Sequence, residues 1–151
     1  FYGVPILQLS EVVKSREVTY VPRVRPFLRG IISVRGTIVP IVDLRRRLAF
    51  NADAPEDEAP DTRRRVTDRE RVLITRQGGE SFGLLVDEVT HPFSLEPGEV
   101  EAPPPTLPRR LVEFVQGIGR VEERIHILLD LDVVLRFDAV ANVRPRKEAT
   151  P

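Results

Sequence analysis

Residues 27–44 read Phe27-Leu-Arg-Gly-Ile-Ile-Ser-Val-Arg-Gly-Thr-Ile-Val-Pro-Ile-Val-Asp-Leu44. Two β-branched runs, Ile31–Val34 and Thr37–Val42, flank the dipeptide Arg35-Gly36. The dipeptide has the length and composition of a two-residue hairpin turn. Pro40 interrupts the second run, which indicates an edge position or a bulge because proline cannot donate to a strand ladder. The stretch therefore predicts a β-hairpin.

This stretch is the first copy of a repeat. Residues 27–48 align without a gap with residues 114–135, at an offset of 87. In each copy an aspartate, Asp43 or Asp130, precedes a short apolar segment, which predicts two N-capped helices. In each copy a glycine, Gly30 or Gly117, heads the hairpin, where we expect unusual backbone geometry or a close approach of strands. Eight positions are identical in the two copies: Phe27/Phe114, Gly30/Gly117, Ile31/Ile118, Val34/Val121, Ile38/Ile125, Asp43/Asp130, Leu44/Leu131 and Leu48/Leu135.

A shorter echo extends the repeat, because Tyr2-Gly3-Val4 resembles Phe82-Gly83-Leu84 at an offset of 80. Two copies of one unit imply two similar small β-subdomains. Neither half is long enough to build a good core alone, so the halves should share a buried seam. We therefore expect a mainly β fold: two small β-barrels packed on a shared hydrophobic seam, with a few short helices.

The remaining elements follow from local pattern. The runs 71–76 and 81–88 predict strands joined across Gly78-Gly79, and 90–95 predicts a third strand. Leu9, Val12 and Val13 share one helical face, which predicts a short helix over 7–16. Residues 51–70 contain no Leu, Ile or aromatic residue and should form a flexible charged loop. A single domain over 1–135 would then be followed by a polar tail, 136–151.

Composition excludes several function classes. The chain of 151 residues carries 23 basic and 23 acidic side chains, whereas a nucleic-acid binder normally has a basic surplus. The absence of cysteine excludes disulfides, thiolate zinc sites and thiol catalysis. Neither His91 nor His126 has a partner at metal-ligand spacing. No apolar run is long enough to cross a bilayer, and no constellation of nucleophile, base or phosphate-binding loop is present. We expect no enzyme activity, cofactor or metal.

Charge is unevenly distributed along the chain. Residues 1–50 hold 9 basic and 3 acidic groups, a net of +6, whereas residues 72–151 hold 9 and 13, a net of −4. Such a dipolar molecule suits head-to-tail pairing of one half with the opposite half of a partner.

Six segments together resemble the CheW family of chemotaxis coupling proteins, and they occur in the family's order from Phe1 to about Leu135. The segments are 2–11, the opening stretch 27–44, Phe82-Gly-Leu-Leu-Val-Asp-Glu-Val89, Ala102-Pro-Pro-Pro105, Gln116-Gly-Ile-Gly119 and Ile127-Leu-Leu-Asp-Leu131. Because members of this family carry a further strand before the Tyr-Gly motif, we expect that strand to lie upstream of Phe1.

The resemblance implies a fold of two small five-stranded β-barrels around a shared hydrophobic seam. It also implies a cytoplasmic, non-catalytic adaptor in receptor arrays. Such an adaptor joins the cytoplasmic tip of chemoreceptors to the regulatory domain of a CheA-type histidine kinase, and it also pairs with other CheW-like domains. It has no nucleic-acid partner and does not insert into the membrane. An alternative stays open, in which the chain is the CheW-like regulatory domain of a CheA-type kinase. The form Arg35-Gly-Thr-Ile-Val-Pro-Ile-Val-Asp favours the free-standing coupler.

The resemblance also suggests site residues. Leu9, Glu11 and the hairpin tip, Arg35 with Gly36, match positions at the kinase interface. A receptor groove would be lined by Ile32, Val34 and Val86. Each residue also has a plainer interpretation: Arg35 and Glu11 as solvated charges, and Leu9 and the groove candidates as core. The sequence leaves these alternatives open.

Overall fold

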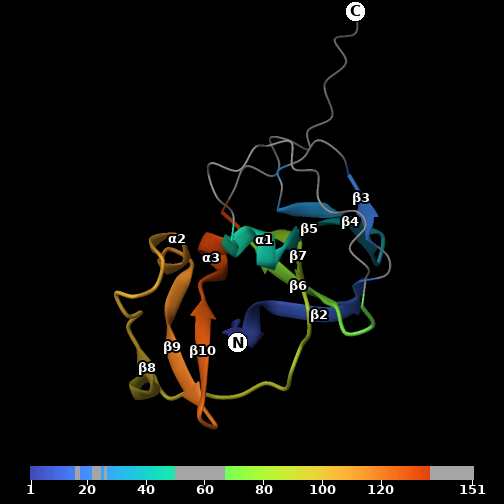
Figure 1. The fold of residues 1–151 in the computed structure, drawn as a ribbon. Coiled ribbons are helices and arrows are strands. Elements are labelled where there is room, and N and C mark those ends of the chain that lie inside the picture. The colour runs from blue at the N-terminus through green and yellow to red at the C-terminus, as the bar shows by residue number, and fades with distance from the viewer. Residues whose placement is uncertain (16–17, 22–24, 26, 50–66, 137–151) are drawn as a thin grey trace, which may run out of the picture.

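The computed structural model describes residues 1–15, 18–21, 25, 27–49 and 67–136. Within them the strands form two sheets that lie side by side, with short helices where the sheets meet (Figure 1). The bounds are β1 (Tyr2–Gly3), η1 (Ile6–Gln8), β2 (Leu9–Lys14), β3 (Thr19–Tyr20), β4 (Leu28–Val34), β5 (Thr37–Asp43), α1 (Leu44–Ala49), β6 (Arg71–Gln77), β7 (Glu80–Val86), η3 (Pro97–Glu99), β8 (Val100–Glu101), α2 (Arg109–Val112), β9 (Val115–Val121), β10 (Arg124–Leu129) and α3 (Leu131–Val134).

The first sheet has the strand order β2-β6-β7-β5-β4-β3, and the second has the order β1-β10-β9-β8. The mainly β fold with two sheet-containing halves and a few short helices is confirmed. The ten described strands divide six and four rather than five and five. In the first sheet, β2 forms one edge by pairing with β6, and β3 forms the other edge by pairing with β4.

The repeat is reproduced in three dimensions. In the first half β4, β5 and α1 follow one another, and in the second half β9, β10 and α3 do so. The N–H of Asp43 donates to the carbonyl of Phe27 at 2.7 Å, and the N–H of Asp130 donates to the carbonyl of Phe114 at 2.8 Å. These two hydrogen bonds join equivalent residues, so the 22-residue alignment corresponds to one structural unit used twice.

The shorter echo is also structural. β7 runs parallel to β5 with Gly83 opposite Ile41, and β1 runs parallel to β10 with Gly3 opposite Leu128. Ile41 and Leu128 are themselves 87 residues apart. Each glycine leaves room for the side chain opposite: a Cβ on Gly83 would lie 2.4 Å from Ile41 Cδ1, and one on Gly3 would lie 2.8 Å from Leu128 Cδ2. The repeat therefore includes the third strand of each half.

The predicted shared seam is present as one buried apolar cluster to which both halves contribute. Because apolar burial stabilises in proportion to area, this cluster stabilises both halves and the contact between them. A second buried cluster lies within the first half and includes Ile32, Val39, Ile41, Val72, Ile74 and Leu85. The shared cluster consists of Phe27, Leu28, Val42, Leu44, Leu73, Phe82, Leu84, Phe114, Leu129, Leu131, Val134 and Leu135.

Two local predictions are wrong. In the described part of the segment 7–16 there is no such helix: Leu7 and Gln8 end η1, and β2 follows, whose alternate residues Leu9, Glu11 and Val13 are the less exposed ones. Over so short a run an i, i+3, i+4 pattern also fits a strand, and pairing with β6 decides between them. The segment 90–95 forms no strand. Pro92 interrupts it, and its apolar side chains pack on the second sheet, with the Phe93 ring 4.6 Å from the His126 ring.

The hairpins are as predicted. β4 and β5 are joined at Arg35-Gly36, and β6 and β7 at Gly78-Gly79. The expectation for Pro40 is wrong: β5 is an inner strand, and Pro40 pairs with Ile31 in regular register. The sheet accepts the proline because pairing with β7 begins only at Ile41.

The charged loop at 51–70 is described only from Thr67 onward, and of the polar tail 136–151 only Arg136 is described; the rest lies outside the described residues. No helix in the described ranges is long and apolar enough to span a membrane.

Candidate interaction groove

An open groove of about 1230 Å³ lies where the two halves meet. Its walls come from β1, η1 and β2, from α1 and α2, and from the segment that follows β7. Apolar side chains predominate in its lining, with charged side chains among them, a composition that is found in protein-binding surfaces. The apolar side chains include Val4, Ile6, Leu9, Leu44, Leu48, Val86, Leu111 and Leu128, and the charged ones include Glu11, Arg45, Asp87, Glu88 and Arg110.

The turn η1 presents an apolar side chain to this groove. Pro5 precedes the turn in extended conformation, and the turn itself leaves Ile6 60% exposed at the groove wall. The adjacent Leu7 is 97% exposed and lies outside the groove lining. A strongly exposed apolar side chain beside a groove is a candidate contact for a binding partner, because no described residue of the chain covers it.

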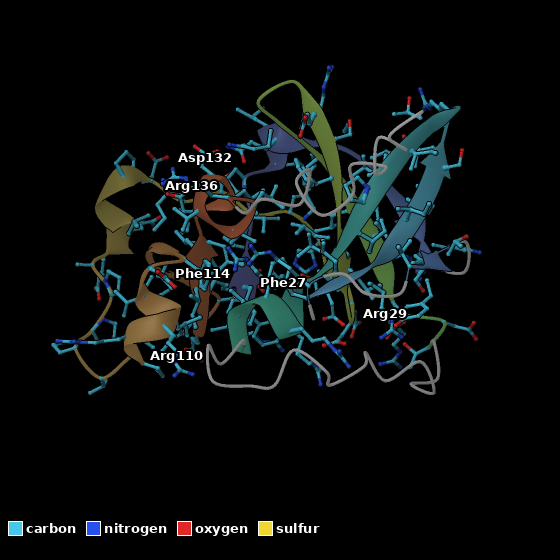
Figure 2. All side chains as sticks on the ribbon, turned by 90° about the horizontal axis from the view of Figure 1, so that it is seen from above. Phe27, Arg29, Arg110, Phe114, Asp132 and Arg136 are labelled. Atoms are coloured by element: carbon cyan, nitrogen blue, oxygen red, sulfur yellow. The ribbon has the colours of Figure 1, made fainter. Side chains whose placement is uncertain are left out.

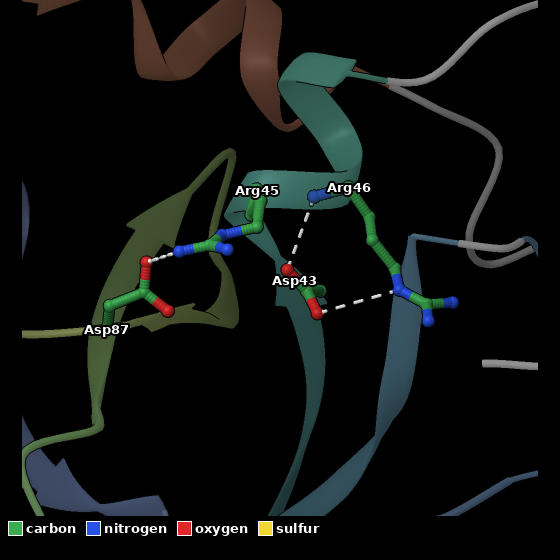
Figure 3. A network of polar contacts seen from close by, with 4 residues as sticks. All are labelled: Asp43, Arg45, Arg46 and Asp87. Carbon is green, nitrogen blue, oxygen red and sulfur yellow. Dashed lines mark hydrogen bonds and ion pairs between the residues drawn. The ribbon is translucent and has the colours of Figure 1, made fainter. Parts of the chain in front are cut away.

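Three charged residues and the capping aspartate form the network of Figure 3. Arg45 Nη2 donates to Asp87 Oδ2 at 2.5 Å, joining the first turn of α1 to the end of β7. Both side chains are largely exposed, so the pair stabilises the fold little and mainly shapes the groove border. The carboxylate of Asp43 is buried, and its Oδ1 accepts from the Arg46 N–H at 3.2 Å while Oδ2 lies 3.8 Å from Arg46 Nε.

The kinase-interface candidates lie on two neighbouring elements. Arg35 and Gly36 form the β4–β5 turn with φ angles of 51° and 80°, both in the left-handed region that a type I′ turn requires. Arg35 Nε lies 3.7 Å from Glu11 Oε1 on β2, although Arg35 is 85% exposed. Leu9, two residues before Glu11, lines the groove as Glu11 does. The structure therefore brings Leu9, Glu11 and the hairpin tip to one region.

The receptor-groove candidates are not brought together. Ile32 is 3% exposed within the apolar cluster of the first half, and Val34 packs against the same cluster. Val86 is partly buried and lines the groove. Of the three, only Val86 is at the groove in this conformation.

The repeated glycines and aspartates serve backbone geometry. A Cβ on Gly30 would lie 2.0 Å from the carbonyl oxygen of Thr19, and one on Gly117 would lie 2.5 Å from Val100 Cγ1. Each glycine thus admits the short strand that pairs at its edge. Asp130 is the N-cap of α3, and its Oδ1 accepts from the Asp132 N–H at 3.0 Å.

Sequence reasoning missed Ile6, the Arg45–Asp87 pair and the contacts of Arg47. Arg45 and Asp87 are 42 positions apart in the chain, so no local spacing links them. A local signal existed for Ile6, since Pro5 followed by two apolar residues does not continue the alternation of a strand.

His126 takes a core position in the second half. It is 8% exposed, its ring contacts the Phe93 ring at an interplanar angle of 46°, and its Nδ1 has no hydrogen-bond partner among the residues that the structure describes. Burial lowers the pKa of His126 below its usual 6.5, and the positive charge of Arg124 lowers it further. The repeat-equivalent residue, 87 positions earlier, is the buried Val39.

Replacing His126 with valine should therefore flatten the pH dependence of stability. With the folded-state pKa lowered, the unfolded chain binds more protons below pH 6.5, so the free energy of unfolding of the unmodified chain falls as the pH drops through that value. Urea titrations at about pH 7.5 and about pH 5 should show a smaller loss in His126→Val than in the unmodified chain. An equal loss in both chains would contradict the assignment.

No group of three or more potential metal-ligating side chains occurs within the described residues.

Comparison with known proteins agrees with this architecture. The family model described as "CheW-like domain" matches residues 1–139. The chain is 28% identical over 144 residues to "Chemotaxis protein CheW" of Bacillus subtilis (strain 168), covering 95% of this chain and 85% of that protein. It is 28% identical over 125 residues to "Protein PilI" of Pseudomonas aeruginosa, covering 82% and 63%.

A solved structure is similar as well. The crystal structure of scaffolding protein TtCheW from Thermoanaerobacter tengcongensis aligns with a TM-score of 0.72 and 27% identity. The alignment covers 91% of this chain and 82% of that one. The repeated β-unit, the shared seam and the family match over residues 1–139 lead to one conclusion: the chain belongs to the CheW-like domain family.

Proposed function

We propose that this chain is a non-catalytic adaptor that couples chemoreceptors to a CheA-type histidine kinase in chemotaxis or motility signalling. Membership of the CheW-like domain family makes it a scaffolding protein of chemotaxis signalling, and the proposal adds the two partners and the surfaces that bind them. Residues 1–135 act in this role as one domain. The observation that carries the proposal is the open, apolar groove between the two halves.

The groove suits the helical hairpin at the cytoplasmic tip of a receptor. An amphipathic helix binds by placing its apolar face in such a groove, while charged residues at the border fix its orientation. Ile6, Leu9 and Val86 offer apolar contact, and Arg45, Asp87 and Glu88 stand at the border. Because the receptor tip is cytoplasmic, this partner places the adaptor in the cytoplasm beside receptor arrays.

The kinase would bind at the region formed by Leu9, Glu11, Arg35 and Gly36. An exposed guanidinium held beside a carboxylate, next to an apolar side chain, has the composition of an interface edge. Regulatory domains of CheA-type kinases are themselves CheW-like, so this surface would also accept other CheW-like domains.

A reconstitution experiment tests the whole proposal. Receptor in vesicles, a CheA-type kinase and this chain are combined, and kinase autophosphorylation is measured with each component omitted in turn. Stimulation that requires all three components supports the proposal. A kinase rate that does not change when the chain is added, although the kinase and the receptor are active with another coupling protein, would rule it out.

Charge reversal at the hairpin tip should weaken kinase binding. Arg35→Glu places a second carboxylate beside Glu11, so the Kd for the isolated kinase regulatory domain should rise about tenfold, the effect of about 1.4 kcal/mol at an interface. Isothermal titration calorimetry gives the Kd, and Arg76→Glu, an exposed arginine on β6, is the matched control.

The double variant Glu11→Arg with Arg35→Glu separates two explanations. If the mutual ion pair positions the turn, the swapped pair restores affinity; if each charge contacts the kinase directly, affinity stays low. Unchanged affinity in Arg35→Glu would refute the placement of the interface.

A further inference from the structure

Arg47 of α1 lies between the aromatic rings of the two repeat copies. Its guanidinium carbon is 4.7 Å from the centroid of the Phe27 ring and 4.9 Å from that of the Phe114 ring. These phenylalanines are equivalent in the repeat, and both are buried. Figure 2 places Phe27 beside α1 and Phe114 among the elements of the second half. One cation therefore contacts both halves through their π faces.

The same guanidinium hydrogen-bonds the end of α3 in the second half. Nε donates to the carbonyl of Val134 at 2.8 Å, and Nη2 lies 3.5 Å from the carbonyl of Val133 and 3.4 Å from that of Arg136. The last carbonyls of a helix have no partners within the helix, and a cation there is favourable. Arg47, from the opposite half of the molecule, thus supplies hydrogen-bond donors to the carbonyls at the C-terminal end of α3.

The repeat explains why this contact falls at Arg47. Its equivalent in the second copy, 87 positions later, is Val134, whose carbonyl accepts the hydrogen bond. Equivalent positions of the two halves therefore meet, and two arginines there would repel each other. The pair of one arginine and one buried valine avoids this repulsion and leaves a directional hydrogen bond between the halves.

Arginine has the geometry that this position needs. A planar guanidinium offers two faces to aromatic rings and several N–H donors in its plane at once, which an ammonium group does not. Burial lowers the pKa of Arg47, yet a guanidinium stays charged in proteins. Because a buried charge without partners is costly, any movement that separates Arg47 from its partners is unfavourable. Burial of the apolar seam around it is non-directional, whereas the hydrogen bonds of Arg47 have defined directions.

We propose that Arg47 is a positioning residue that holds the two halves at one relative orientation and thereby sets the width of the groove. The groove walls connect directly to it: α1 also supplies Leu44, Arg45 and Leu48, whereas Leu128 and Leu129 of β10 belong to the half that Arg47 holds. Turning one half against the other would move these walls apart. The consequence for receptor binding rests on the proposed function, but the orientation itself does not.

The orientation is measurable on the chain alone. Because the sequence contains no cysteine, Ser33→Cys and Arg120→Cys introduce two unique thiols at repeat-equivalent, exposed positions on β4 and β9. Spin labels there report the distance between the halves by double electron–electron resonance. Arg47→Leu should broaden or shift the distance distribution, and Arg47→Lys, which keeps charge without the planar fork, should give an intermediate result.

Arg46→Lys is the matched control, because Arg46 lies on the same helix and lysine keeps a positive charge beside the buried carboxylate of Asp43 in its own half. Its distribution should match that of the chain with the two labels alone. If Arg47→Leu does not fold, Arg47→Lys decides the question. A distribution in the Arg47 variants as narrow as in the unmodified chain overturns the proposal.

A second measurement connects orientation to binding. If only about a tenth of Arg47→Leu molecules keep the binding orientation, the apparent Kd for a receptor-tip hairpin rises about tenfold. Arg46→Lys should leave this Kd unchanged. If the unmodified chain does not bind the hairpin, the proposed function is contradicted, but the result from the spin labels still holds. If the distance between the labels changes in Arg47→Leu while the Kd does not, the proposed effect on the groove is overturned.

Discussion

Replacing Gly30 with alanine is expected to lower the free energy of unfolding by about 3 kcal/mol, at the upper end of overpacking effects. The added Cβ would lie 2.0 Å from the carbonyl oxygen of Thr19 and 2.8 Å from the carbonyl carbon of the same residue. These are backbone atoms, so no side-chain rotation relieves the contact. The edge strand β3, which pairs with β4 at this glycine, must move away.

Two other glycines give a graded comparison. A Cβ on Gly117 would meet the side chain of Val100 at 2.5 Å, and the backbone only at 3.1 Å, so Gly117→Ala should cost about 1 kcal/mol. A Cβ on Gly98 meets nothing within 4 Å, and Gly98→Ala should be close to neutral. Urea denaturation of the three variants gives the order directly. A Gly30→Ala variant as stable as Gly98→Ala would contradict the close approach of β3.

Replacing Ile6 with aspartate is expected to weaken binding of a receptor-tip hairpin about 30-fold, the effect of losing a hot-spot contact of about 2 kcal/mol. Ile6 is exposed before binding, so the substitution should leave the melting temperature nearly unchanged. The loss has a simple cause: a carboxylate in an apolar groove must give up its hydration when the partner covers it. Fluorescence anisotropy of a labelled hairpin measures the Kd.

Leu7→Asp is the control for this prediction. Leu7 belongs to the same turn and is even more exposed, but it does not line the groove. The same change in charge and polarity one residue away should therefore have little effect. If both variants lose the same affinity, or if neither loses any, the partner does not bind in the groove.

Much of the fold was predictable because its signals are local and repeated. The β-branched runs flanking Arg35-Gly36 and the runs flanking Gly78-Gly79 predicted hairpins that the structure contains. The 22-residue repeat predicted two equivalent units and a seam between them. The segment 7–16 was predicted as a helix because a period of two and a period of 3.6 cannot be separated over so few residues.

The candidate site was predictable only in part. Leu9, Glu11 and Arg35 were singled out through a family resemblance, and the structure places Arg35 Nε 3.7 Å from Glu11 Oε1. Ile32 was proposed as a groove residue, yet it lies in the apolar cluster of the first half, because strand alternation does not say which face of a sheet borders a groove. The roles of these residues in binding stay predictions until the experiments above are done.

The sequence by itself determined the repeating unit, its turns and its caps. The turns and caps depend on residues within a few positions of one another, and the repeat is visible as identical residues at a constant offset. Tertiary structure alone decided which distant residues meet: Arg45 with Asp87 at the groove border, and Arg47 with Phe114 and the end of α3. The physical reason is that periodicity and turn chemistry specify local conformation and burial. The relative placement of two halves depends instead on how their side chains pack across a shared core.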